Sequence, residues 1–485
     1  MATVDKTSIR EEVIRLKQEF EQLCSTGNVS PEVRAIMNSL LVVVELILSI
    51  FLEKTTRKNS KNSSLPSSQT EKDDSAKQDS RSKGKGHRVN GKIGNTRVKE
   101  TVTIAKAETC DTCGAPLDPT PCQGHERRTK IDIVFEKVVE HVDAEIKECP
   151  NCKATVKGDF PKDMPGTLQY GNGLKAFVIH MIISQMVALN RVQKQISAMI
   201  NVVIAEASLL KFVWRLHQSL ATWEKKAIES ILQAPSIHVD ETSFRVEGKN
   251  SWIHVYSSGE ITLKLLHRKR GKEAIMDLDI IPRYGGIIIH DCWASYLSYD
   301  SCGHGLCGSH LLRELTFVID SNDYKWSRNM KRLLQETCKI VSKREEKCLT
   351  EKEYANLQKR YRNILTRGEK EMPEIPPKPK GKRGKMAKSD AHNLCERLRN
   401  HETAVLLFAK NPHVAFTNNR AERDLRMAKV KQKVSGCFRR TQYAHAYCRI
   451  SSYLQTMANR GVNPLVAIQM ALADEITVTD LEMGE

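Results

Sequence analysis

The chain has 485 residues, which is longer than one ordinary domain and predicts two to four folded units. Its 76 Lys and Arg residues outnumber its 58 Asp and Glu residues, so the formal net charge is +18 at pH 7. A charge this positive favours a polyanionic partner, nucleic acid before an anionic membrane surface.

Neither a signal peptide nor a membrane span is expected. The N-terminal stretch is charged throughout, and the most apolar run, Leu40–Leu52, contains Glu45 and is too short to cross a bilayer. We therefore expect a cytoplasmic protein that does not enter a membrane. Its 14 cysteines are then thiols or metal ligands, because disulfides are rare inside cells.

Residues 1–53 are predicted to be a helical, coiled-coil-like region. A first apolar stripe alternates spacings of four and three: Ile9, Val13, Leu16, Phe20 and Leu23. Ser30 and Pro31 then fit a helix start, with the serine as the cap and the proline at the first helical position. Two short amphipathic helices cannot bury both faces alone, so this region belongs either to the chain's own core or to a homo-oligomer contact.

Residues 54–103 and 104–165 differ sharply in composition. The first segment is rich in Ser, Lys and Asn with almost no large apolar side chain, which predicts a disordered basic linker. The second carries two Cys-x-x-Cys pairs, Cys110 with Cys113 and Cys149 with Cys152. Two such pairs can complete one tetrahedral Zn²⁺ site, which we favour over a redox dithiol. This segment is therefore predicted to be a small zinc-binding domain.

Two further features of this segment bear on the zinc site. Ile131, Ile133 and Phe135 alternate as in a strand, which would bring the two cysteine pairs together in a β-ribbon. Cys122 and His125 form a third pair, which could replace one of the two.

Residues 166–234 have apolar residues at helical spacing and predict a helical region. One helix is expected within 174–200 and a second over 205–232. The Met, Trp and His side chains here, among them His180 and His217, are assigned to the core rather than to a ligand site.

After Pro235 the apolar period changes from helical to two. Three strands and a helix are predicted in this order: 236–248, 251–258, 260–271 and 271–280. Ile287–Ile289 then predicts a strand buried on both faces. A ribonuclease H-like α/β domain begins in this order, although many other α/β folds do too. We assign residues 235–322 to the first part of such a core.

Two acids interrupt this apolar pattern. Asp240 follows Val239 in the first strand, and Asp291 follows the triple-isoleucine strand at its carboxyl end, where open α/β sheets place their sites. Burying carboxylates there costs on the order of several kcal/mol unless a cation compensates. Glu241 must face the other side of the sheet. Holding two hard divalent ions by oxygen then requires a third carboxylate.

Glu422 is the candidate for that third carboxylate, and two interpretations of it compete. It fits a capping box with Asn419 and an i, i+4 pair with Arg426, both ordinary helix features. It also lies among cations dense enough for DNA phosphates, as a metal-holding acid would. The cations predicted to contact DNA are Arg420, Arg423, Arg426, Lys429, Lys431, Lys433, Arg439 and Arg440, with the loop 377–388. Asp424 is predicted to lie on the surface.

Long motifs in a fixed order give the sequence a family resemblance. They include "HVDETSFRVEGKNSWIHVYSS", "GGIIIHDCWASY", "HGLCGSHLLREL" and "FTNNRAERDLRMAKVKQKVSGCFRR". With "NSKNSSLPSSQ", "GKRGK" and the paired cysteines, they cover nearly the whole chain. On these residues the chain resembles a DDE transposase of the insertion sequence 66 family.

The resemblance implies a multidomain α+β protein. Its parts are N-terminal helices, a small zinc-ribbon-like domain and an α/β ribonuclease H-like catalytic core with a helical insertion. The insertion would span 323–412, the Glu-bearing part of the core 413–450, and a C-terminal helical tail 451–485.

The resemblance also implies a site and partners. Asp240, Asp291 and Glu422 would form the catalytic triad and hold two Mg²⁺ or Mn²⁺ ions, while the two cysteine pairs would hold one structural Zn²⁺. The partner would be double-stranded DNA, as element ends and as target, in the cytoplasm at the nucleoid. A homo-oligomer is expected, and much of this family needs companion proteins encoded by the same element.

Cys307 and His310 lie three residues apart, and this spacing is similar to a Cys-x-x-His signature in related transposase families. With His304 they could hold a second zinc ion. We favour a structural role for Cys307 and His310 beside the acids.

The sequence therefore predicts a DNA transposase that cleaves and joins strands at insertion-sequence ends by two-metal phosphoryl transfer. One alternative is a ribonuclease H-like nuclease without strand transfer. Another is a zinc-containing DNA-binding protein derived from a transposase, against which the intact acid triad argues.

Overall fold

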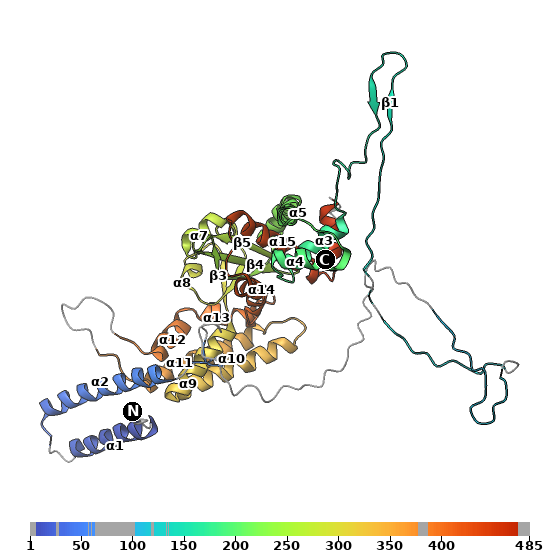
Figure 1. The fold of residues 1–485 in the computed structure, drawn as a ribbon. Coiled ribbons are helices and arrows are strands. Elements are labelled where there is room, and N and C mark those ends of the chain that lie inside the picture. The colour runs from blue at the N-terminus through green and yellow to red at the C-terminus, as the bar shows by residue number, and fades with distance from the viewer. Residues whose placement is uncertain are drawn as a thin grey trace. The chain divides into compact units, whose positions relative to one another are not determined.

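Two compact units make up the chain in the computed structural model (Figure 1). The described residues are 6–25, 29–56, 58, 59, 61–63, 102–117, 121–131, 133, 135–376 and 387–473. The first unit combines Met1–Gly84 with Ala221–Thr456, and the second combines Lys85–Leu220 with Met457–Glu485. All three acids of the predicted triad belong to the first unit.

A five-stranded mixed sheet forms the centre of the first unit. Its strands are β3 (Ser236–Val246), β4 (Lys249–Ser258), β5 (Ile261–His267), β6 (Ile287–His290) and β7 (Gly303–Leu306), in the order β5-β4-β3-β6-β7. The first three form the predicted antiparallel meander, whose first hairpin turns at Glu247 and Gly248, both with positive φ. β6 runs parallel to β3, and β7 runs parallel to β6.

Helices cover both faces of this sheet. One face packs on α6 (Ala221–Gln233), α7 (Lys272–Leu278), the 3₁₀ turn η2 (Ile281–Arg283) and α8 (Ala294–Leu297). The other face carries α14 (Asn419–Ser435) and α15 (Thr441–Asn459). Ile237 and Val239 lie in the core of the first face. Because side chains alternate along β3, Asp240 faces α14 and Glu241 faces that core.

The segment between β7 and α14 builds a second, helical core. Its helices are α9 (Gly308–Asn322), α10 (Lys325–Lys343), α11 (Glu351–Glu371), α12 (Asp390–Asn400) and α13 (Glu402–Lys410). Trp326 and Tyr361 are fully buried in it. Gly368 allows α11 to approach Trp326, because a Cβ at this position would lie 2.7 Å from the indole.

The N-terminal helices α1 (Lys6–Ser25) and α2 (Pro31–Thr55) form a hairpin with an ion pair of 3.0 Å between Lys17 Nζ and Glu45 Oε1. Ser30 caps α2, as predicted. The run Leu40–Leu52 was expected to be too short to cross a bilayer. The helix α2 that contains it is longer, and by length and composition alone it could cross a membrane. That indication is weak, since α2 carries Glu45 and its C-terminal end packs on α9.

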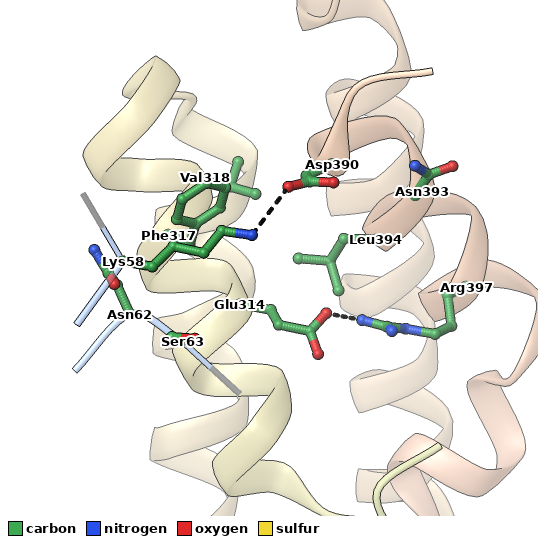
Figure 2. A pocket seen from close by; sticks show the side chains of 10 residues that line it. All are labelled: Lys58, Asn62, Ser63, Glu314, Phe317, Val318, Asp390, Asn393, Leu394 and Arg397. Carbon is green, nitrogen blue, oxygen red and sulfur yellow. Dashed lines mark hydrogen bonds and ion pairs between the residues drawn. The ribbon is translucent and has the colours of Figure 1, made fainter. Parts of the chain in front are cut away.

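The end of α2 and the residues after it are attached to the helical core. Buried Glu53 accepts hydrogen bonds of 2.6 and 2.9 Å from the first two N–H groups of α12. Asn62 donates to Asp320 of α9 at 2.9 Å, beside a cavity of about 290 Å³ (Figure 2). Among the first residues of the linker predicted for 54–103, Lys58 and Asn62 have polar partners on α12 and α9. Residues 64–101 of this linker lie outside the described residues.

Helices also form the core of the second unit: α3 (Asn172–Ile183), α4 (Leu189–Ile200), α5 (Glu206–Ser219) and α16 (Pro464–Leu472). The helix predicted over 205–232 is divided at Leu220, which is also where one compact unit ends and the other begins. The stretch 174–200 is divided too, where Met186 takes a positive φ of 59°. Residues 474–485 of the predicted tail lie outside the described residues.

The cysteine-rich segment contains a short antiparallel ribbon, β1 (Ile146–Glu148) with β2 (Thr155–Lys157), whose turn carries Cys149 and Cys152. The strand predicted at Ile131, Ile133 and Phe135 is not formed in the described residues there, and all three side chains are exposed. Alternating apolar residues form a strand only where a partner strand and a core face are available to them.

Candidate functional site

Asp240 lies on β3, and Asp291 directly follows the adjacent parallel strand β6. The register of β3 and β6 pairs His238 with Ile289. Continued by two residues, the same register places Asp240 opposite Asp291, the first residue after β6. The strand β6 therefore ends just before Asp291, whose charge raises the pKa of Asp240.

Glu422 reaches the same place on the first turn of α14. Asn418, which precedes this helix, donates to the Val239 carbonyl at 2.8 Å, and its side-chain oxygen lies 2.9 Å from Nδ1 of His238. Both bonds hold the start of α14 against the strand that carries Asp240. Residues 180 positions apart in the chain are thereby brought together.

The pKa of Asp240 is raised well above its ordinary range. Burial is the largest cause, and the charges of Glu241, Asp291 and Glu422 raise it further. The backbone N–H of Glu241, which donates to Asp240 at 2.8 Å, acts in the opposite direction. The three acids interact electrostatically, although in the described residues their oxygens do not form a group within 4.8 Å of one another. Their oxygens are the donors that Mg²⁺ and Mn²⁺ prefer, so the residues fit a hard divalent ion.

Two helices start beside these acids. The N–H of Gly308, the first residue of α9, donates to the Phe416 carbonyl at 2.7 Å, just before α14. A Cβ at Gly308 would lie 2.3 Å from the Phe416 ring, so the close approach requires glycine. The positive ends of both helix dipoles favour anions here, either the carboxylates or bound phosphates.

Glu241 is buried on the opposite face of the sheet, as predicted. Arg270 donates to its carboxylate at 2.7 Å, and the Tyr296 hydroxyl donates at 2.5 Å. The guanidinium also lies 4.4 Å from the ring centre of Trp293 and 5.1 Å from that of Trp252. Burial raises the pKa of Glu241, while Tyr296 and Arg270 act to lower it. This paired acid holds the sheet to α8 and is not a fourth member of the site.

Cys307 and His310 lie next to Glu422. Nε2 of His310 is 3.4 Å from Oε1 of Glu422. Burial lowers the pKa of His310 and raises that of Cys307. His304 has a different partner, because its Nε2 donates to the Tyr299 carbonyl at 2.9 Å. The three-residue zinc set that includes His304 is therefore not assembled.

Two predictions for α14 are wrong. Asp424 is buried rather than on the surface, and it accepts hydrogen bonds of 2.8 Å from hydroxyl groups of β4 and β5. The face of α14 that carries it packs on the sheet, which helical spacing alone does not reveal. The capping box of Asn419 with Glu422 is absent, since Asn418 precedes the helix and no side-chain cap bond forms. Glu422 faces His310 instead.

The cations predicted to contact DNA divide into three groups. Five are exposed on α14 and just after it: Arg423, Arg426, Lys433, Arg439 and Arg440. Arg420 donates to the Gly259 carbonyl at 2.6 Å and pairs with Asp424. Its guanidinium therefore binds groups of the protein itself. Lys431 is buried near the Phe438 ring. Residues 377–386 of the predicted loop lie outside the described residues.

Lys429 is a half-buried cation beside Asp240, and Arg397 is a half-buried cation beside His310 that sequence reasoning did not find. The pKa of Lys429 is lowered by burial, while the charge of Asp240 acts in the opposite direction. Arg397 of α12 pairs with Glu314 of α9 (Figure 2), and its charge acts to lower the pKa of His310. No spacing or motif in the sequence identifies Arg397, because its position near His310 depends on how the helices of the insertion pack.

The two cysteine pairs have matching backbone turns. The N–H of Cys110 donates to the Ala115 carbonyl and that of Cys149 to the Ala154 carbonyl, each at 2.9 Å. Backbone N–H groups lower the pKa of Cys110 and of Cys149, which favours the thiolate form that metals bind. The described residues of this segment contain no group of three ligand atoms within 4.8 Å. The four-cysteine zinc site therefore stays a prediction.

Substituting serine for Cys110 and Cys149 together is expected to remove about one zinc ion per chain, because each pair loses a thiolate. Elemental analysis of the purified protein measures this loss. Cys122→Ser is the matched control and should keep the zinc. Full zinc retention by the double variant would contradict the four-cysteine site, and loss from Cys122→Ser would assign it to the third pair.

Comparison with known protein families gives one match that bears on these residues. The description "Transposase IS66 family" matches residues 167–446, which include Asp240, Asp291 and Glu422. No curated protein matches the chain. The family match covers more than half of the sequence. The chain therefore belongs to the transposase IS66 family, a family of DNA-processing enzymes.

Proposed function

We propose that the protein is a DDE transposase that cleaves DNA strands at insertion-sequence ends and joins them to target DNA. The observation that carries this proposal is the approach of Asp240, Asp291 and Glu422 from β3, β6 and α14. The sheet order, with an antiparallel meander followed by two parallel strands, supports a ribonuclease H-like core. Membership of the family supports the transposase activity.

The three carboxylates would hold two Mg²⁺ or Mn²⁺ ions, one on Asp240 with Asp291 and the other on Asp240 with Glu422. Bound there, the ions supply a water of lowered pKa and neutralise charge on the attacking and leaving oxygens. The protein's contribution to catalysis is to hold the three carboxylates in position. The raised pKa of Asp240 is the cost of holding its carboxylate in a half-buried place beside other acids.

Positively charged residues would bind and orient the DNA backbone. The exposed cations of α14 would contact phosphates along the duplex, and Lys429 and Arg397 would contact those nearest the acids. Such contacts place the scissile phosphodiester without reading its sequence. Recognition of the element ends therefore lies elsewhere in the chain.

Self-association would follow from the N-terminal hairpin. Ile36 and Ile47 of α2 are 67% and 61% exposed, on a stripe of apolar residues that supports a homo-oligomer. The complex would act in the cytoplasm, at the nucleoid, together with accessory proteins of the same element.

Incubation with a labelled element end, a target plasmid and Mg²⁺ tests the proposal. The expected products are a strand cut at the element boundary and the same strand joined to the plasmid. Cutting without joining would indicate a nuclease instead. Binding of the end without cutting would indicate a DNA-binding protein derived from a transposase.

A further inference from the structure

Cys307, His310 and Glu422 form a second group of metal-binding side chains next to the three acids. One ligand atom from each lies within 4.8 Å of the other two. We propose that this group binds Zn²⁺ or a similar borderline-soft ion, and that the bound ion inhibits the enzyme by engaging Glu422.

The ligands are held in place by the starts of two helices. Cys307 directly precedes α9 and its sulfur accepts the N–H of Asn418 at 3.1 Å, while His310 lies on the first turn of α9. Glu422 lies on the first turn of α14. A backbone hydrogen bond of 2.7 Å joins the two helix starts. The three side chains therefore stay close even without an ion.

Two atoms at this place lack a hydrogen-bond partner in the part of the chain that the structure describes. Nδ1 of His310 and Oε1 of Glu422 are both buried and unbonded. Nε2 of His310 approaches that oxygen to 3.4 Å without hydrogen-bond geometry. Buried polar atoms without partners are rare and costly. An ion between the imidazole, the carboxylate and the thiolate would give Oε1 of Glu422 a partner.

The donor set selects the ion. A thiolate, an imidazole and a carboxylate suit Zn²⁺ and Co²⁺, whereas Mg²⁺ takes oxygen ligands and avoids sulfur. Asp240 and Asp291 offer only oxygen. Softer ions should therefore bind at Cys307 and His310, and hard ions at Asp240 and Asp291. Both groups use Glu422 as a further ligand.

The regulatory consequence rests on the proposed function. An ion held by Cys307 and His310 would draw Glu422 away from Asp240 and leave the magnesium site with two acids. Zn²⁺ should then inhibit strand cleavage in the presence of Mg²⁺, and the inhibition should depend on the thiol.

Cobalt binding tests the site without any assay of activity. The full-length chain with Cys110→Ser and Cys149→Ser, which removes the other thiolate pairs, is titrated with Co²⁺. A thiolate-to-cobalt charge-transfer band is expected to saturate at about one ion per chain. Adding Cys307→Ser should abolish the band, and Glu422→Gln should weaken binding about tenfold or more. Cys302→Ser, which changes the buried thiol just before β7, should leave it intact.

Two results would overturn the site. One is the absence of a band while Cys307 is intact, and the other is a band that survives Cys307→Ser in a chain whose circular dichroism is unchanged. His310→Gln gives a second check, because it should shift the ligand-field bands even if Cys307→Ser folds poorly.

Zinc inhibition of strand cleavage is the second arm of the test. Inhibition that Cys307→Ser relieves and Cys302→Ser does not would support the regulatory role. A cobalt band without zinc inhibition would support the site and contradict that role. If no cleavage occurs at all, the proposed function fails while the cobalt result still decides the site.

Discussion

Neutralising any one of the three carboxylates is expected to abolish strand cleavage and joining while leaving DNA binding intact. Asp240→Asn, Asp291→Asn and Glu422→Gln each remove a charge needed to hold the divalent ions but keep the side-chain shape. The expected loss of rate is at least about 10³-fold, or about 4 kcal/mol of transition-state stabilisation. Single-turnover cleavage of a labelled element end measures it.

Asp277→Asn is the matched control, because Asp277 is an exposed acid of α7 in the same core. It should cut and join at the rate of the unchanged protein. Binding of element ends by all four variants, measured by gel shift, separates lost chemistry from lost recognition. Normal cleavage by any of the three triad variants would contradict the proposed site.

Asp240→Asn is also expected to raise the melting temperature of the metal-free protein above neutral pH. The folded-state pKa of Asp240 is raised, so the folded state favours the protonated form. Its contribution to stability is therefore present below the ordinary pKa of about 4 and is lost as pH rises through the raised value. Asparagine removes that penalty, which is on the order of 1–3 kcal/mol or about 2–10 °C.

Magnesium gives the complementary result. Mg²⁺ should raise the melting temperature of the unchanged protein more at pH 8 than at pH 6, because the ion stabilises the ionised carboxylates. The Asp240→Asn variant should show little of this shift. Thermal scans in chelator and in Mg²⁺ at both pH values measure it. A variant that melts lower than the unchanged protein without metal, and responds fully to Mg²⁺, would contradict a destabilising buried carboxylate at this position.

Much of the sheet and its acids could be predicted from local pattern. Period-two alternation identified β3, β4 and β5, and the triple isoleucine identified β6. An acid at the carboxyl end of a buried strand is costly wherever it lies, so Asp291 could be found without knowing its neighbours. The antiparallel meander of the first three strands was predicted as well, but the pairing of β6 with β3 and the strand β7 were not.

The rest depends on packing that the sequence does not state. Asp424 could not be placed, because helical spacing shows which residues share a face but not what covers that face. Arg397 acts through Glu314 of α9, and Glu53 acts through the start of α12, each a segment far away in the chain. The strand expected at Ile131 is not formed in the described part of that segment, because its alternating apolar residues have no core to pack on.

The most direct measurement of the central claim is anomalous scattering from Mn²⁺ in crystals of the full chain bound to an element end. The expected result is manganese coordinated by carboxylate oxygens of Asp240, Asp291 and Glu422, with the scissile phosphate beside it. Manganese bound elsewhere, with Glu422 directed into solvent, would contradict it.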